Sequence, residues 1–505
     1  MSTNRKIAQD ATKFLAGTIV SSIANVIRGL LIARILGPAM FGIWHIFTVI
    51  NGRYNNQADL GLTNGMFKLI PIQRGVNNNQ KAENIKNVTF WANVFIFCSI
   101  NLILFLSTFV YHNFFFNLFY PYPKEGIFGL RLLVILNLLT QLYIFYTNIL
   151  RANKKFGLES FSSSLIAIIS LLLFIIFVKF FTNNLMAALL ALILAYVIVN
   201  IFVIVKTNYK YPLFWDNKLF IEIFLAGFPL FLGNITYAFL ISIDRIVLAK
   251  FFGPENLGLY AFGLNLTIIM ALVPNALAST LFPHMLEKFS QSKDPASMSK
   301  MVFLPTKINT FIMFYICGFM SLLIPLLIKY LFPAYTSGIR SAVLLSMGIY
   351  FLSLNTVTST YLISINKQYS IIFIQLLSIS FSIIIYMYFV FANMGIDGIA
   401  IGTILTYFIY SFMVLYESLG CVYKKKKDVW LVIFDLHIPF ILLISIFVLS
   451  KLLTNQFLSD LSYLNQTIVK MFAFIIFSIP FFISINKQTD MISLIKNHLL
   501  KRQPL

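Results

Sequence analysis

The first 423 residues of the chain read as one helical unit written twice, and this repeat restricts the possible folds more than any other feature. Three pairs of segments recur in the same order at nearly the same spacing: Phe14 to Gly17 with Phe224 to Gly227, Ala33 to Pro38 with Ala249 to Pro254, and Asn153 to Phe156 with Asn366 to Tyr369. A chance match could produce one such pair, but three in order indicate duplication. Duplicated helical halves are typical of membrane proteins that work by alternating access.

The composition places the chain in a membrane. It is 59% hydrophobic and only 11% charged, whereas a soluble domain is about a quarter charged. Its apolar runs predict about 14 transmembrane helices of roughly 20 residues each. The second predicted span, 41–65, is the weakest. The stretch 219–250 is longer than one span needs, and Pro229 is expected to bend or interrupt it.

The net charge of +21 follows from how the basic residues are distributed among the loops. If the amino terminus is cytoplasmic, about two-thirds of the 38 lysines and arginines fall on the cytoplasmic side, as the positive-inside rule requires. The sequence therefore predicts a multi-pass protein of the cytoplasmic membrane with both termini in the cytoplasm. The same distribution removes the reason to expect nucleic-acid binding.

An even number of helices between equivalent points makes the repeat parallel. We expect an amino-terminal six-helix lobe over 1–213 and a carboxy-terminal six-helix lobe over 214–423. Residues 424–505 match neither half, and they predict two additional transmembrane helices and a cytoplasmic tail.

The sequence contains no pattern that indicates an enzyme. Cys98, Cys317 and Cys421 are scattered through apolar runs, and no Cys/His spacing predicts a metal. Nucleotide-binding and nucleophile motifs are absent as well. We therefore expect no catalytic residue, no metal and no cofactor, with coupling to H⁺ or Na⁺ left open.

Polar and ionisable residues inside the predicted spans mark the candidate site, because each costs free energy in hydrocarbon. The basic candidates are Arg28, Arg53 and Arg245, and the acidic ones are Asp59 and Asp244. Uncharged candidates lie on the same predicted helices and on the span 127–150: Ser21, Asn25, Asn55, Asn137, Gln141, Asn234 and Tyr237. A water-filled central cavity explains these residues together. For Asp244 and Arg245, a structural ion pair remains an alternative.

The motifs resemble a known family. Leu36 to Trp44, Asp59 to Leu62 and Asp244 to Lys250 resemble the polysaccharide-transport branch of the multidrug/oligosaccharidyl-lipid/polysaccharide (MOP) superfamily. The resemblance implies a V-shaped pair of six-helix lobes, as in multidrug antiporters of the MATE type. It further implies a flippase for undecaprenyl-pyrophosphate-linked oligosaccharide units in O-antigen, capsule or exopolysaccharide assembly. The implied partners are this lipid-linked substrate, membrane lipids and the polysaccharide polymerase machinery, and we expect a monomer.

The residues fit such a substrate. Arginine binds phosphate oxygens in pairs, so Arg28, Arg53 and Arg245 are expected to hold the diphosphate in the central cavity. The uncharged polar side chains are expected to bind sugar hydroxyls. Asp59 or Asp244 is expected to couple an ion or to partner the arginines when the cavity is empty. In the repeat alignment that pairs Gly37 with Gly253, Arg28 corresponds to Asp244.

Other functions stay open at this point. A lipid II flippase is closely related to the first interpretation. A cation-coupled multidrug exporter of the same superfamily should have acidic residues in its cavity. A non-transporting scaffold or a membrane enzyme of polysaccharide assembly is a further alternative.

Overall fold

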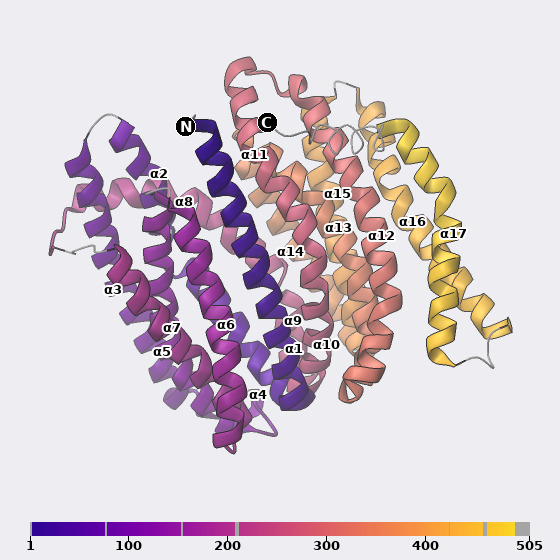
Figure 1. The fold of residues 1–505 in the computed structure, drawn as a ribbon, viewed down its shortest axis with the longest axis horizontal. Coiled ribbons are helices and arrows are strands. Elements are labelled where there is room, and N and C mark those ends of the chain that lie inside the picture. Colours follow the sequence, from indigo (N-terminus) through magenta and orange to yellow (C-terminus); the bar gives the residue numbers. More distant parts are fainter. Residues whose placement is uncertain are drawn as a thin grey trace. The chain divides into compact units, whose positions relative to one another are not determined.

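The computed structural model describes residues 3–75, 78–152, 155–207, 212–423, 425–457 and 462–489, and these form helices joined by short turns, with no strand among them (Figure 1). Among these described residues, thirteen helices are long and apolar enough to cross a membrane. The chain is therefore an all-α, multi-pass membrane protein, as the sequence predicts.

The described residues contain one span fewer than the 14 predicted, because a single kinked helix covers the first predicted span and most of the second. The helix α1 (Thr3–Gln57) runs through both the first and the second predicted span. Gly37 breaks it with φ 69° and ψ 171°, a conformation that glycine adopts without a steric penalty. Pro38 then restarts the helix with its φ already set for a first turn.

The chain separates into two compact units, Met1–Ala261 and Phe262–Leu505. Unit 1 contains α1 and the following elements: α2 (Leu62–Gly75), α3 (Asn79–Val110), α4 (His112–Leu118), α5 (Pro123–Ala152), α6 (Phe156–Phe180), α7 (Asn184–Thr207), α8 (Asn217–Leu240), α9 (Ile243–Phe251) and the first half of α10 (Gly253–Ile268). These units are defined by packing, whereas the boundaries at 213 and 423 come from the sequence repeat and remain predictions.

Two groups of helices make up unit 1. In one group, α6 packs against α1 and α7, and α5 also packs against α7. In the other, α2 packs against α3 and α8, around a core that includes Met66, Ile85 and Ile223. Gly61 and Gly227 let the backbones of α2 and α8 meet, since a Cβ on Gly227 would lie 1.9 Å from the carbonyl oxygen of Gly61.

The repeated Gly-Pro segments meet each other within unit 1. Gly253 has φ 77°, close to the 69° of Gly37, so both copies of the motif have their glycine at positive φ. A Cβ on Gly42 would lie 1.7 Å from the carbonyl oxygen of Pro254, and one on Gly258 would lie 1.8 Å from that of Pro38. The contact is reciprocal, which supports the repeat predicted from the sequence.

The sequence predicts that Pro229 bends or interrupts the long apolar stretch, and an interruption is not what the structure has. The helix α8 continues through Pro229, and the chain breaks instead at Ile241 and Ser242, before α9. A proline removes one backbone donor, but a transmembrane helix tolerates this where neighbouring groups satisfy the freed carbonyl.

Unit 2 is a second helical bundle, in which α13 packs against α12 and α15. Its elements, after the end of α10, are η1 (Ile269–Ala271), α11 (Leu272–Ser292), η2 (Pro295–Met298), α12 (Ser299–Leu331), η3 (Pro333–Gly338), α13 (Ile339–Ser364), α14 (Gln368–Phe391), α15 (Gly395–Val422), α16 (Lys426–Phe457) and α17 (Tyr463–Thr489).

The two helices that match neither repeat lie at one side of unit 2 (Figure 1). Polar contacts join α16 to α12 and α13. Lys307 on α12 forms an ion pair with Asp435, and the hydroxyl of Tyr350 on α13 donates a 2.8 Å hydrogen bond to the carbonyl oxygen of Leu436.

Candidate functional site

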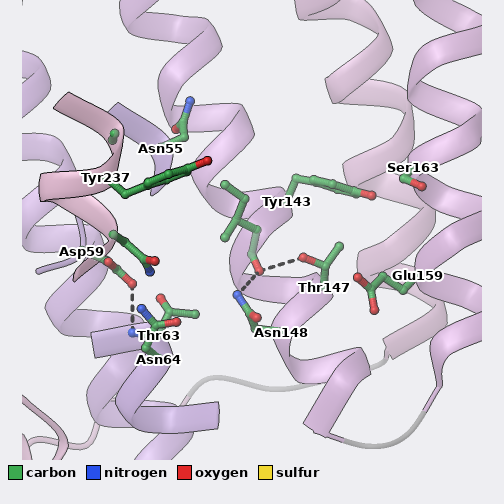
Figure 2. A pocket seen from close by; sticks show the side chains of 13 residues that line it. Asn55, Asp59, Thr63, Asn64, Tyr143, Thr147, Asn148, Glu159, Ser163 and Tyr237 are labelled. Atoms are coloured by element: carbon green, nitrogen blue, oxygen red, sulfur yellow. Dashed lines mark hydrogen bonds between the residues drawn. The ribbon is translucent and has the colours of Figure 1, made fainter. Parts of the chain in front are cut away.

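A polar cavity of about 480 Å³ lies inside unit 1. It is bounded by the end of α1, α2, α5, the start of α6 and the end of α8. Its lining is mostly polar: Asn55, Asp59, Thr63, Asn64, Tyr143, Ile144, Thr147, Asn148, Glu159, Ser163, Asn234, Tyr237 and Ala238. We call it the acidic cavity, for the two carboxylates that line it. Asp59 and Tyr237 lie on one side, and Thr147 and Glu159 on the other (Figure 2).

Asp59 is held in the cavity wall by the backbone of the α1–α2 turn. One carboxylate oxygen accepts a 3.0 Å hydrogen bond from the N–H of Gly61, and the other accepts a 2.9 Å bond from the N–H of Thr63. The turn needs Leu60 and Gly61 at positive φ, 51° and 85°. The carboxylate therefore caps the start of α2 and is fixed in position.

The opposite wall is built by α5 and α6. Thr147 and Asn148 both donate hydrogen bonds of 2.9 Å to the carbonyl oxygen of Ile144, which holds their side chains close to the α5 backbone. Glu159 lies in the first turn of α6 and is only 5% exposed. The positive end of the helix dipole at this first turn is a favourable place for a carboxylate.

A second, smaller cavity of about 280 Å³ lies beside the first, and the two share Tyr143 and Ser163. Among its lining residues, as the structure describes them, Arg28 carries the one formal charge. A nitrogen of its guanidinium donates a 2.7 Å hydrogen bond to the hydroxyl of Ser170 on α6. We call this the arginine cavity; its polar lining also includes Asn25, Thr48, Asn51 and Tyr196.

The structure brings together six of the predicted site residues. Asn55, Asp59, Asn234 and Tyr237 line the acidic cavity, and Asn25 and Arg28 line the arginine cavity. They come from α1, its turn into α2, and α8.

Three further predicted residues are buried in helix contacts. Gln141 donates a 2.8 Å hydrogen bond to the backbone oxygen of Asn55 and so joins α5 to the end of α1. Asn137, also on α5, donates a 3.4 Å bond to the side-chain oxygen of Asn101 on α3. Ser21 is buried in α1 outside both cavity linings.

The predicted charges on α9 have partners of their own. Asp244, 1% exposed, accepts a 2.7 Å hydrogen bond from the hydroxyl of Tyr260 and lies 3.9 Å from the Nε of Arg245. Neither residue lines the two cavities. Arg53 lies on α1 between Thr48 and Asn55, but its side chain is outside the described part of the chain.

Sequence reasoning noted Asn148 on α5 among the polar residues of the predicted spans, but it missed the wall that α6 provides, above all Glu159. The fifth span was predicted to begin at residue 160, which placed Glu159 in a loop. A signal was present: Glu159, Ser163 and Ser170 are spaced by four and seven residues and so lie on one helical face. Tyr143, Thr147 and Thr63 carry no charge and did not stand out among the other polar residues.

Within the described residues, no group of three or more His, Cys, Asp or Glu side chains could hold a metal ion. The site is thus defined by two adjoining polar cavities inside a bundle of apolar helices. The protein is therefore a multi-pass membrane protein with polar cavities among its membrane-spanning helices.

A model of the polysaccharide biosynthesis protein family matches residues 31–335, more than half of the chain. The chain belongs to this family. No curated protein sequence matches it.

The fold is that of the MOP superfamily. The structure is similar to an inward-facing multidrug resistance MATE family transporter of that superfamily, with 14% identity, 80% of this chain and 94% of that chain covered, and a TM-score of 0.70. It is also similar to the lipid II flippase MurJ in an inward closed conformation, with 15% identity, 93% and 99% covered, and a TM-score of 0.69. A third similar structure is a MOP superfamily transporter from Pyrococcus furiosus, with 16% identity, 82% and 95% covered, and a TM-score of 0.58.

These similarities confirm the resemblance that the sequence motifs indicate. The three similar proteins are transporters or flippases rather than enzymes. At such low identity the similarity establishes the fold, and the substrate has to be argued from the site.

Proposed function

We propose that the protein is a flippase that moves undecaprenyl-pyrophosphate-linked oligosaccharide units across the cytoplasmic membrane by alternating access. The units would serve the assembly of O-antigen, capsule or exopolysaccharide. Membership of the polysaccharide biosynthesis protein family and the fold of a transporter superfamily support this proposal.

The observation that carries the proposal is the pair of adjoining polar cavities. An oligosaccharide diphosphate has a long polar head and needs a wet, hydrogen-bonding site within the hydrocarbon layer. Arg28 supplies the positive charge for the diphosphate. Its guanidinium has five N–H donors and donates one hydrogen bond to Ser170, so it can donate further bonds to phosphate oxygens. The amides and hydroxyls of the acidic cavity are then available to the sugars.

In this mechanism Arg53 and Arg245 assist Arg28 with the diphosphate. Asp59 and Asp244 partner arginines or bind a coupling H⁺ or Na⁺ when the substrate is absent. Exchange of partners would lower the free-energy cost of an unpaired buried charge during the return step. The termini are cytoplasmic in this proposal, the protein is a monomer, and the polymerase machinery receives the product.

Purified protein in proteoliposomes tests the proposal directly. Synthetic polyprenyl-diphosphate disaccharide is placed in both leaflets, and its exposure is followed by oxidation with membrane-impermeant periodate. We expect complete oxidation with the protein and about half without it. Equal oxidation in both preparations would disprove the flippase function, and movement of lipid II alone would identify a lipid II flippase.

A second candidate function follows from the acidic cavity. Two carboxylates and no basic side chain line it in the described structure, which is what a cation-coupled exporter of cationic compounds requires. Gradient-driven uptake of ethidium into the same proteoliposomes tests it. Uptake without any movement of lipid-linked disaccharide would establish the exporter instead of the flippase.

A further inference from the structure

The two cavities separate charge along the site. The acidic cavity contains Asp59 and Glu159, whereas the arginine cavity contains Arg28. Both cavities are lined by Tyr143 and Ser163, so they adjoin at these two side chains, where an elongated ligand would pass from one to the other. A ligand with its diphosphate at Arg28 would place the adjoining sugar among the carboxylates.

The wall around Glu159 offers mainly hydrogen-bond acceptors. A hydroxyl has a single proton to donate, and Thr147 and Ser163 each donate theirs to a backbone oxygen, of Ile144 and Ser160. Their remaining capacity is therefore that of acceptors. A ligand in contact with this wall must bring donors of its own.

The other wall carries a second negative charge. Both carboxylate oxygens of Asp59 accept backbone N–H bonds, so this negative charge is fixed in the wall. An anionic sugar would bring acceptors and a like charge to such a wall, and both are unfavourable.

We infer that the acidic cavity selects the sugar next to the diphosphate, accepting sugars that are uncharged or carry an amine and rejecting uronic acids. This inference rests on the proposed flippase function and names its substrate class. Glu159 is the residue that we expect to set the preference, since its buried carboxylate lines the wall opposite Asp59.

The test uses three synthetic polyprenyl-diphosphate disaccharides that differ only in the first sugar: an N-acetylhexosamine, a hexosamine with a free amine, and a hexuronic acid. Flipping by the full-length protein is measured with the periodate assay. We expect the two non-acidic units to move roughly tenfold faster than the uronate, or more. In Glu159→Gln this ratio should fall several-fold, because the amide removes the like charge and supplies a donor.

Glu255→Gln is the matched control, since Glu255 is an exposed carboxylate that lines neither cavity. It should keep the wild-type ratio. Equal rates for all three units in the wild type would overturn the inference while leaving the flippase proposal intact. Movement of none of them would instead contradict the proposed function itself.

The wild-type rate ratio needs no variant, so the test decides even if Glu159→Gln does not fold. If Glu159→Gln and Glu255→Gln fold and give the same ratio as the wild type, Glu159 does not set the preference and the assignment fails.

Discussion

Arg28 is a positive charge placed in an otherwise apolar helix, and the structure explains how the membrane tolerates it. Its guanidinium donates a hydrogen bond to Ser170. The side chain lines the arginine cavity together with polar residues of α1 and α7. A charged side chain inside a membrane segment is costly and is usually found facing a polar interior. Sequence reasoning singled out Arg28 because the cost of its charge made it conspicuous, and the structure places it in a cavity lining.

We predict that Arg28→Ala reduces flipping of the N-acetylhexosamine disaccharide by about 30-fold or more, since a charge-assisted hydrogen-bonding pair is lost. Arg28→Lys should retain part of the activity, because an ammonium cannot contact two phosphate oxygens with one planar fork. Initial rates in proteoliposomes at matched protein content provide the measurement. Arg340→Ala, which removes an exposed arginine of unit 2, is the control. Full activity of Arg28→Ala would leave Arg28 with a purely structural role.

Glu159 shows where prediction at the residue scale fails. A carboxylate next to the end of a predicted span can lie in a solvated loop or in a buried cavity wall. Hydropathy alone does not distinguish these two positions. The deciding fact is tertiary: α5 and α6 pack so that Glu159 is buried opposite Asp59. Gln141 and Asn137 show the converse, since polar residues with the right spacing are used to join helices.

At the scale of elements, α1 is kinked at Gly37, and beyond the kink Gly42 packs against the backbone of Pro254 at the start of α10. We predict that Gly42→Ala lowers the thermal stability of the purified protein markedly, because the new Cβ would lie 1.7 Å from the carbonyl oxygen of Pro254. Backbone on the opposing segment cannot move as a flexible side chain can, so a destabilisation of about 1–3 kcal/mol or more is expected.

Gly52→Ala is the matched control on the same helix. A Cβ there would meet nothing within 4 Å, and alanine favours helix more than glycine does. Thermal unfolding in detergent, followed by the loss of the monodisperse peak in size-exclusion chromatography, compares the two variants. Equal stability of both would show that the α1–α10 contact is looser than the structure has it.

The helices themselves could be predicted well because a span of apolar residues is a strong and local signal. Their interruptions could not. Pro229 appeared to be the natural break in the long stretch 219–250, but the break lies at Ile241 and Ser242, where no proline occurs. Neighbouring helices determine which backbone groups can be left without a partner, and a single sequence does not contain that information.

At the scale of the whole molecule, the distribution of lysine and arginine predicts the orientation in the membrane. We predict that a cysteine at position 80 is protected in intact cells and that one at position 124 is labelled by a membrane-impermeant maleimide. Gln80 and Lys124 are both exposed and lie at the starts of α3 and α5. The background is a variant with Cys98, Cys317 and Cys421 replaced by serine.

Permeabilised cells provide the control, since both positions should then be labelled. Labelling of position 80 in intact cells, with position 124 protected, would reverse the orientation and place both termini outside. The all-helical class, the family and the fold were predictable at this scale, because composition and repeated motifs are properties of the whole chain. The assignment of the substrate needs the cavities.

The reciprocal fit of Gly42 on Pro254 and of Gly258 on Pro38 has a consequence for the history of the chain. A contact in which one surface patch meets a second copy of itself is isologous, the kind that closes a homodimer about a two-fold axis. An ancestral single-repeat protein with this Gly-Pro segment would have carried a self-complementary patch, so it could pair with its own copy before gene fusion. In the fused chain, a side chain at either glycine would meet the backbone of the other repeat, so a substitution in one copy of the motif disturbs both copies.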